Sequence, residues 1–157
     1  MSSITKHGLV VVLVGVFVMA WRIQTHEDIA VAQTRKPIMM TRIYTGADGQ
    51  SHAEQVEMKL NGNVSEMMKA SGVEFSRRAP GPVSDWHTGP RRQFVITLSG
   101  RAEIEVAGGQ KVMIGPGHIN LIEDTTGKGH TTRNVGPDER IVVTIPLADQ
   151  SVSGASR

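Results

Sequence analysis

The sequence predicts an all-β protein with one small sandwich or barrel domain behind an N-terminal hydrophobic segment. After residue 40, turn signals rich in glycine and proline recur about every 8 to 12 residues, as in small sandwiches and barrels. No long stretch with helical spacing of apolar residues separates these turns. The roughly 120 residues that follow the N-terminal segment suit one compact domain with a modest core.

Residues 1–32 are predicted to be a signal peptide or an N-terminal membrane anchor. Lys6 and His7 precede an apolar run over residues 8–21, which is shorter than the roughly 20 residues that span a bilayer as a helix. Cleavage after Ala20 or Ala32 would make the protein periplasmic or secreted, whereas a retained segment would anchor it in the inner membrane. If Met39 or Met40 is the true start, the domain is cytoplasmic.

The strands are expected where β-branched and apolar residues lie between turn signals. Residues 33–40 are assigned to a linker, 41–150 to the domain and 151–157 to a disordered tail. One helical turn is expected at residues 65–70, and the proline-rich loop at 79–82 excludes regular structure. The predicted strands cover residues 41–45, 56–60, 73–78, 93–98, 102–106, 111–114, 119–122, 131–135 and 140–145.

Composition excludes several classes of site. The chain has no cysteine, so it has no disulfide framework, no thiolate metal site and no cysteine nucleophile. The formal charge of +2 and the calculated pI of 9.2 are mildly basic, but the acidic and basic residues are interspersed, which argues against nucleic acid as a partner. Any metal must be bound by nitrogen and oxygen atoms.

Two histidines on neighbouring strand signals indicate a metal site. His87 and Gln93 would share a strand face if the segment is extended, although Pro90 interrupts the alternation. His130 would join them where a small barrel brings two strands together. Imidazole and amide groups suit a divalent Fe, Mn, Ni, Cu or Zn ion. Asp85 is the nearest acid that could complete the set, and Glu123 and Asp124 are the alternatives.

The segment from about residue 79 to 145 resembles the cupins, which are small jelly-roll barrels. Their first motif reads G-x5-H-x-H-x3-E-x6-G, and here Gly81, His87 and Gly100 keep its spacing while Gly89 and Gln93 replace the second histidine and the glutamate. In the second motif Gly127, His130 and Asn134 keep the family spacing. The resemblance, which extends to short bacterial single-domain cupins, implies a single cupin-type jelly-roll β-barrel and a metal site that has lost two of its usual four ligands.

Other residues indicate a small anionic ligand and self-association. Arg91 would share the face of His87 and could bind a carboxylate or phosphate with both guanidinium nitrogens. Trp86 could form a wall of the pocket, and Asn134 shares the face of His130, so these three are the expected substrate-binding residues. The apolar alternate face of the 93–98 strand predicts a homodimer.

Three functions remain open from the sequence. The first is a metal-dependent oxygenase, isomerase or hydrolase that acts on a small anionic substrate. The second is a domain that binds a small molecule without chemistry, which the missing carboxylate favours. The third is an oligomeric structural module with a vestigial metal site. The fold alone does not choose among them, because one architecture serves many chemistries.

Overall fold

A computed structural model describes residues 36–148. The predicted signal peptide or anchor and the tail at 151–157 lie outside the described residues. Across residues 36–148 every regular element is a β-strand except one short 3-10 turn, η1 (Ala107–Gly109). The same stretch has no helix of the length and apolarity that crossing a membrane requires. The prediction of an all-β fold is therefore confirmed.

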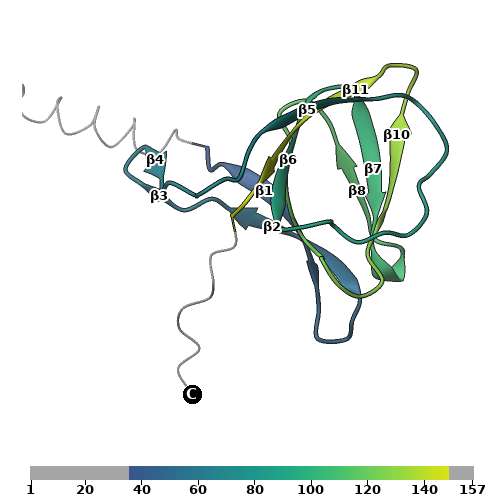
Figure 1. The fold of residues 1–157 in the computed structure, drawn as a ribbon, viewed down its shortest axis with the longest axis horizontal. Helices are drawn as coiled ribbons and strands as arrows, with labels where there is room; N and C mark the ends of the chain where they lie inside the picture. The colour runs from purple at the N-terminus through teal and green to yellow at the C-terminus, as the bar shows by residue number, and fades with distance from the viewer. Residues whose placement is uncertain (1–35, 149–157) are drawn as a thin grey trace, which may run out of the picture. The chain divides into compact units, whose positions relative to one another are not determined.

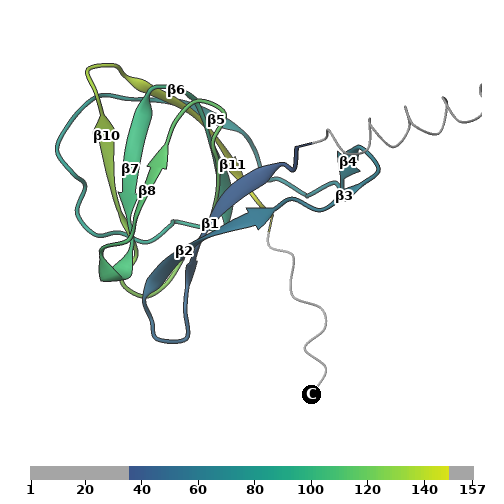
Figure 2. The ribbon, with the colours of Figure 1, turned by 180° about the vertical axis from the view of Figure 1, so that it is seen from behind.

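All of the strands except a short two-stranded hairpin form two facing sheets (Figures 1 and 2). Neighbouring strands run antiparallel except β1 and β9, which are parallel. The larger sheet has the order β2 (Ser51–Glu57), β1 (Met39–Thr45), β9 (Ile119–Glu123), β6 (Gln93–Ser99), β11 (Arg140–Pro146) and β5 (Glu74–Arg78). The smaller sheet has the order β10 (Thr131–Val135), β7 (Arg101–Glu105) and β8 (Lys111–Ile114).

The main hydrophobic core lies between the two sheets. Ile43 and Ile122 of the six-stranded sheet pack with Ala102, Ile104 and Ile114 of the three-stranded sheet, and all five are buried. Branched aliphatic side chains suit this position because they pack closely on a pleated surface. The two sheets thus share one core, and a cavity lined by His87 and His130 opens between them.

The six-stranded sheet also carries a second apolar cluster on its outer face. Phe94 and Leu121 are buried there with Leu147, whereas their neighbours Val95 and Ile122 point to the interior. Successive side chains of a strand point to opposite faces, so the apolar runs in β6 and β9 serve both faces of the sheet. The predicted alternation between Phe94 and Val95 is confirmed.

Two predictions about secondary structure are wrong. The second strand covers Ser51–Glu57 rather than residues 56–60, because residues 51–55 also pair with β1, so that β2 pairs with the whole of β1. The helical turn expected at 65–70 is absent: residues 66–69 are irregular and Ala70 forms a single bridge to Leu147. Just before them β3 (Leu60–Asn61) and β4 (Val64–Ser65) form a small hairpin. The positive φ of Gly62 permits the tight reversal between them. The other predicted strands are present within two residues of their expected ends.

Candidate functional site

A cavity of about 260 Å³ opens into the interior between the sheets, and we call it the barrel cavity. Its apolar wall consists of aliphatic side chains from β6, β7, β8 and β9, and its polar wall includes both of the histidines predicted from the motifs. No carboxylate side chain is among the lining residues in the described part of the chain. These are Arg78, His87, Gly89, Pro90, Gln93, Val95, Ile104, Ile114, Asn120, Ile122, His130 and Arg140.

Backbone hydrogen bonds hold His87 and His130 side by side. The N–H of His87 donates to the carbonyl of His130 at 3.0 Å, and the N–H of His130 donates back at 2.9 Å. The ring centroids lie 4.6 Å apart with the planes tilted by 54°. Gly129 makes this approach possible, since a Cβ at this position would lie 2.1 Å from the carbonyl oxygen of His87. The structure therefore brings together the two histidines that the sequence places 43 residues apart.

A buried carboxylate orients His130. Nδ1 of His130 lies 2.7 Å from Oδ2 of Asp124, which also accepts a hydrogen bond from Ser51 Oγ at 2.8 Å. Both His130 and Asp124 are buried. Because a carboxylate only accepts hydrogen bonds, Nδ1 carries the proton, and the lone pair of the neutral ring is on Nε2.

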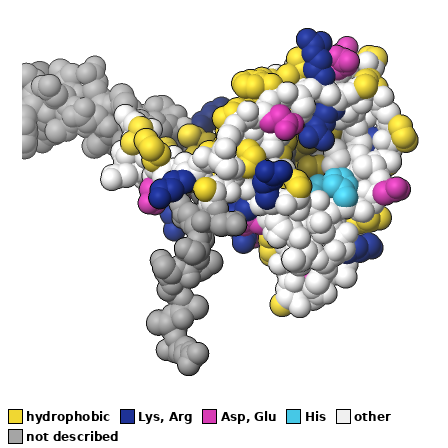
Figure 3. Space-filling model, in the orientation of Figure 1, with side chains coloured by type: hydrophobic (Ala, Val, Ile, Leu, Met, Phe, Trp, Pro, Cys, Tyr) yellow, Lys and Arg dark blue, Asp and Glu magenta, His cyan; other side chains and the backbone are white. Residues whose placement is uncertain are grey.

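A backbone carbonyl orients His87 in the same sense. Nδ1 of His87 lies 2.9 Å from the carbonyl oxygen of Asp85 and 3.4 Å from Oγ of Ser84. The shorter contact favours the proton on Nδ1, because a carbonyl oxygen only accepts hydrogen bonds. His87 is exposed, and the space-filling view shows histidine atoms open on this face beside apolar surface and basic side chains (Figure 3). Within residues 36–148 Nε2 of neither ring has a hydrogen-bond partner. Metal-binding histidines show this arrangement, in which the second nitrogen donates to an oxygen atom.

The structure does not bring the carboxyl group of Asp85 into the barrel cavity. Asp85 is exposed and contributes only its carbonyl oxygen to the site. The expectation that its carboxylate would complete a ligand set does not match this geometry. The segment before β6 is irregular, so the rule that residues two apart share a face does not extend from His87 back to Asp85.

Gln93 and Gly89 occupy the positions of the two ligands that the cupin motif would add. Gln93 begins β6 and lines the barrel cavity. Gly89 is buried, and a Cβ there would lie 2.5 Å from Cγ2 of Ile122. A methyl group of Ile122 thus fills the space into which a side chain at residue 89 would project.

The two imidazoles are suitable metal ligands, but the carboxylate ligand of the cupin motif is missing. No group of three or more histidine, aspartate or glutamate side chains able to hold a metal occurs in the described ranges. The donors predicted from the motifs are Nε2 of His87, Nε2 of His130 and the amide oxygen of Gln93. Oδ1 of Asn120, which lines the same cavity, has no hydrogen-bond partner within residues 36–148. Asp124 is a carboxylate nearby; its Oδ2 binds His130 and Ser51, and its buried Oδ1 has no hydrogen-bond partner among the same residues.

Arg91 and Trp86 do not line the barrel cavity. Arg91 lies in the bend before β6 and is exposed, because extended structure begins only at Gln93 and the predicted alternation of faces fails across Pro90. The indole ring of Trp86 is 39% exposed and carries the ammonium group of Lys128 at 4.3 Å from its centroid. This cation–π contact ties the loop of the first motif to the loop of the second.

Asn134 lies in an adjoining cavity, of about 350 Å³, that shares His87 with the barrel cavity. Its side-chain amide donates to the carbonyl oxygens of Arg78 and Ala79, at 3.0 and 2.7 Å. The residue therefore fixes the end of β5. Its amide nitrogen is committed to this backbone contact.

Arg140 and Arg78 supply the positive charge that sequence reasoning assigned to Arg91. Both line the barrel cavity and the adjoining cavity. Arg140 is 3% exposed, and burial, together with the charge of Arg78, lowers its pKa to about 10. The sequence carries a signal for the inward position of Arg140. Along β11 it lies two and four residues from Val142 and Thr144, so the three side chains share one face, and all three are buried.

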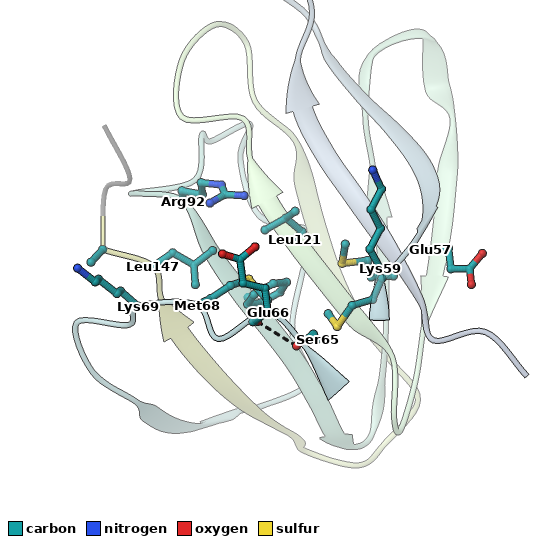
Figure 4. Close-up of a pocket in the computed structure, with 13 residues that line it drawn as sticks. Glu57, Lys59, Ser65, Glu66, Met68, Lys69, Arg92, Leu121 and Leu147 are labelled. Atoms are coloured by element: carbon teal, nitrogen blue, oxygen red, sulfur yellow. Dashed lines mark hydrogen bonds between the residues drawn. The ribbon is translucent and has the colours of Figure 1, made fainter. Parts of the chain in front are cut away.

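A second concavity of about 360 Å³, which we call the outer groove, lies over the outer apolar cluster (Figure 4). Leu121 and Leu147 lie within it, while Lys59, Glu66 and Lys69 extend around its rim. It contains none of the predicted site residues. The homodimer that the apolar outer face predicts stays a prediction.

No family model matches the chain, and no curated protein matches it. Among solved structures it is similar to a double-stranded β-helix domain protein of Klebsiella pneumoniae, described as uncharacterized (23% identity, 54% of this chain, 81% of that chain, TM-score 0.39). It is also similar to a Cupin 2 conserved barrel domain protein of Salinispora arenicola (19%, 60%, 82%, 0.40). The Cnp3 cupin domain of Schizosaccharomyces pombe is a third (10%, 74%, 88%, 0.38).

The described strands form two facing sheets, which is the arrangement that the motif resemblance implies. The backbone bridge between His87 and His130 joins the loop before β6 to the residue before β10, so both motif histidines line the barrel cavity. The all-β fold expected from the sequence is confirmed. The similarities to solved structures identify no activity, which must be argued from the cavity.

Proposed function

We propose that the protein is a small-molecule-binding cupin that takes up a divalent transition metal in the barrel cavity. The observation that carries the proposal is the common orientation of the two imidazoles, whose Nδ1 protons are held by oxygen atoms while Nε2 of each is left without a partner among residues 36–148. His87, His130 and Gln93 would hold the ion. Iron, manganese, nickel, copper and zinc all accept such nitrogen and oxygen donors.

The proposed metal site carries no negative charge of its own. Two neutral imidazoles and an amide lack the carboxylate of the 2-His-1-carboxylate sites that activate oxygen. When bound, the ion would supply Lewis-acid or oxygen-activating chemistry. Asp124, which accepts a hydrogen bond from Ser51, holds the His130 ring, and the aliphatic wall excludes water from one side of the cavity. An oxygenase, isomerase or hydrolase is the finer proposal, with the protein acting outside the cytoplasm or at the inner membrane.

The alternative is a ligand-binding cupin without catalysis and with a vestigial metal site. The observation that favours it is the packing of Ile122 against Gly89, which fills the place of the second motif histidine with a methyl group. The two functions predict different results when a metal ion is added: the first predicts binding through the cavity histidines, and the alternative predicts none.

A calorimetric titration of the full chain with Zn²⁺ and Ni²⁺ tests the proposal. We expect one equivalent to bind the wild type and none to bind the His87→Ala or His130→Ala variants. Gln93→Glu adds the missing charge and should tighten binding by about tenfold, the equivalent of 1.4 kcal/mol. His52→Ala is the matched control, because His52 pairs with Asp48 at the surface and should leave metal uptake unchanged. Equal uptake by the wild type and both cavity histidine variants would contradict the proposal and favour the alternative.

A further inference from the structure

The barrel cavity is lined by two arginines that have no counter-ion among residues 36–148. Arg140 is buried, its Nε has no hydrogen-bond partner within residues 36–148, and it forms no ion pair with the described residues. A buried guanidinium is costly unless it is paired and hydrogen-bonded. The domain leaves this cost uncompensated at a point where a ligand could compensate for it.

The second arginine makes the arrangement less favourable in the absence of a ligand. Arg78 of β5 lies directly opposite Arg140 of β11 in the antiparallel register. Side chains of directly opposite residues lie on the same face, and like charges placed so are destabilising. Neither the barrel cavity nor the adjoining cavity, which both arginines also line, has an aspartate or glutamate among its lining residues. An anion between the two guanidiniums would remove both costs.

The rest of the cavity specifies the body of the ligand. Val95, Ile104, Ile114 and Ile122 form an aliphatic wall in the same space of about 260 Å³. Such a volume is below the 300–1,000 Å³ typical of pockets for drug-sized ligands, so the occupant is small. An aliphatic wall gains nothing from an inorganic anion and stabilises a short hydrocarbon group.

The geometry points to a small organic carboxylate as the ligand, with its carboxylate between Arg140 and Arg78 and its hydrocarbon body against the aliphatic wall. This inference rests on the proposed small-molecule-binding function and names the class of molecule. Guanidinium groups bind carboxylates through two parallel hydrogen bonds, which gives the site its preference for that group. The arginines that recognise it lie on β5 and β11, outside both histidine motifs.

The test compares 4-methylpentanoate with 4-methylpentanamide, which has the same shape and no charge. Calorimetric titration of the full chain should show the acid binding about tenfold or more tightly than the amide. Arg78→Gln, a change at an exposed residue, should remove about tenfold of the affinity for the acid and leave that for the amide unchanged. Arg140→Lys keeps the buried positive charge but cannot form two parallel hydrogen bonds, so it should also weaken binding of the acid.

Arg77→Gln is the matched control, since Arg77 is the adjacent residue of β5 and pairs with Glu139 at the surface. It should bind the acid as the wild type does. Equal binding of acid and amide would overturn the inference while the proposed function stands. Inorganic phosphate that binds more tightly than the acid would overturn the organic class. Binding of neither probe would also overturn the inference, and the zinc titration would then judge the proposed function separately.

Discussion

The two faces of the six-stranded sheet treat charge in opposite ways. On the outer face Glu123 accepts hydrogen bonds from both Arg42 and Arg92, so two arginines share a carboxylate. On the inner face Arg78 and Arg140 lie opposite each other with no carboxylate among the residues that line their cavity. A charged side chain that contributes to stability is expected to pair with an opposite charge, because an unpaired buried charge is unfavourable. The carboxylate ligand proposed above would account for this difference.

The largest effect is expected at Gly129, which lets the inner polar groups meet. Gly129→Ala puts a Cβ against the carbonyl of His87 and imposes a side chain on a residue with φ of +78°. We expect a loss of more than about 2 kcal/mol in the free energy of unfolding, measured in urea. Gly117→Ala separates the two causes, because Gly117 has φ of +79° and open space around its Cβ. Equal losses in both variants would show that the contact with His87 contributes nothing.

An intermediate effect is expected on the outer face. Burial alone would raise the pKa of Glu123, but the hydrogen bonds from Arg92 and Arg42 hold it below the usual 4.5. A lowered pKa in the folded state stabilises the protein above pH 4.5, and this contribution is lost as the pH falls through the lowered value. Glu123→Gln should therefore cost about 1 kcal/mol at pH 7.

Urea unfolding at a series of pH values measures this contribution. The difference between wild type and Glu123→Gln should be constant above about pH 5.5 and shrink below pH 4.5. Glu54→Gln is the control, because Glu54 binds the same Arg42 at an exposed position, and its effect should be small at every pH. A difference that grows in acid would contradict the assignment of this pairing to Glu123.

The smallest expected effect on stability comes from reversing the charge of one arginine on the inner face. Arg78→Glu places a carboxylate opposite Arg140 and replaces a repulsion with an attraction, so the unliganded domain should gain about 0.5 kcal/mol. The same change should abolish binding of 4-methylpentanoate, because the introduced carboxylate occupies the place of the ligand's. Arg77→Glu, on the surface beside Glu139, should lose stability instead. A loss of stability in Arg78→Glu would indicate that the inner arginines do not repel each other.

The sequence predicted the parts of the fold that depend on local signals. Turn residues and alternating apolar residues located most strands, because glycine and proline restrict the backbone and the alternation follows from the strand itself. The prediction of a helical turn at 65–70 is wrong. No local signal distinguishes such a turn from the irregular segment that follows β4, in which Ala70 forms a single bridge to Leu147. Long-range pairing decided that segment, and the sequence does not encode it locally.

The candidate site was predicted in part for the same reason. Motif spacing identified His87 and His130. The assumption that side chains alternate along a strand wrongly predicted that Arg91 points inward, because the chain around Pro90 is not a strand. The rule does hold within β11, where it would have turned Arg140 inward with Val142. Arg78 required the register of β5 against β11, which is information about two distant segments.

The contact between Gly89 and Ile122 has a consequence for how such a site changes over generations. Gly89→His would meet the methyl group of Ile122, while a smaller residue at 122 would leave a void beside Gly89. Each single substitution is therefore unfavourable by itself, and only the two together would restore a third imidazole. The proposed ligand set is separated from the fuller one of the cupin motif by two coupled mutations, so selection for metal binding would act first on Gln93, where one substitution suffices.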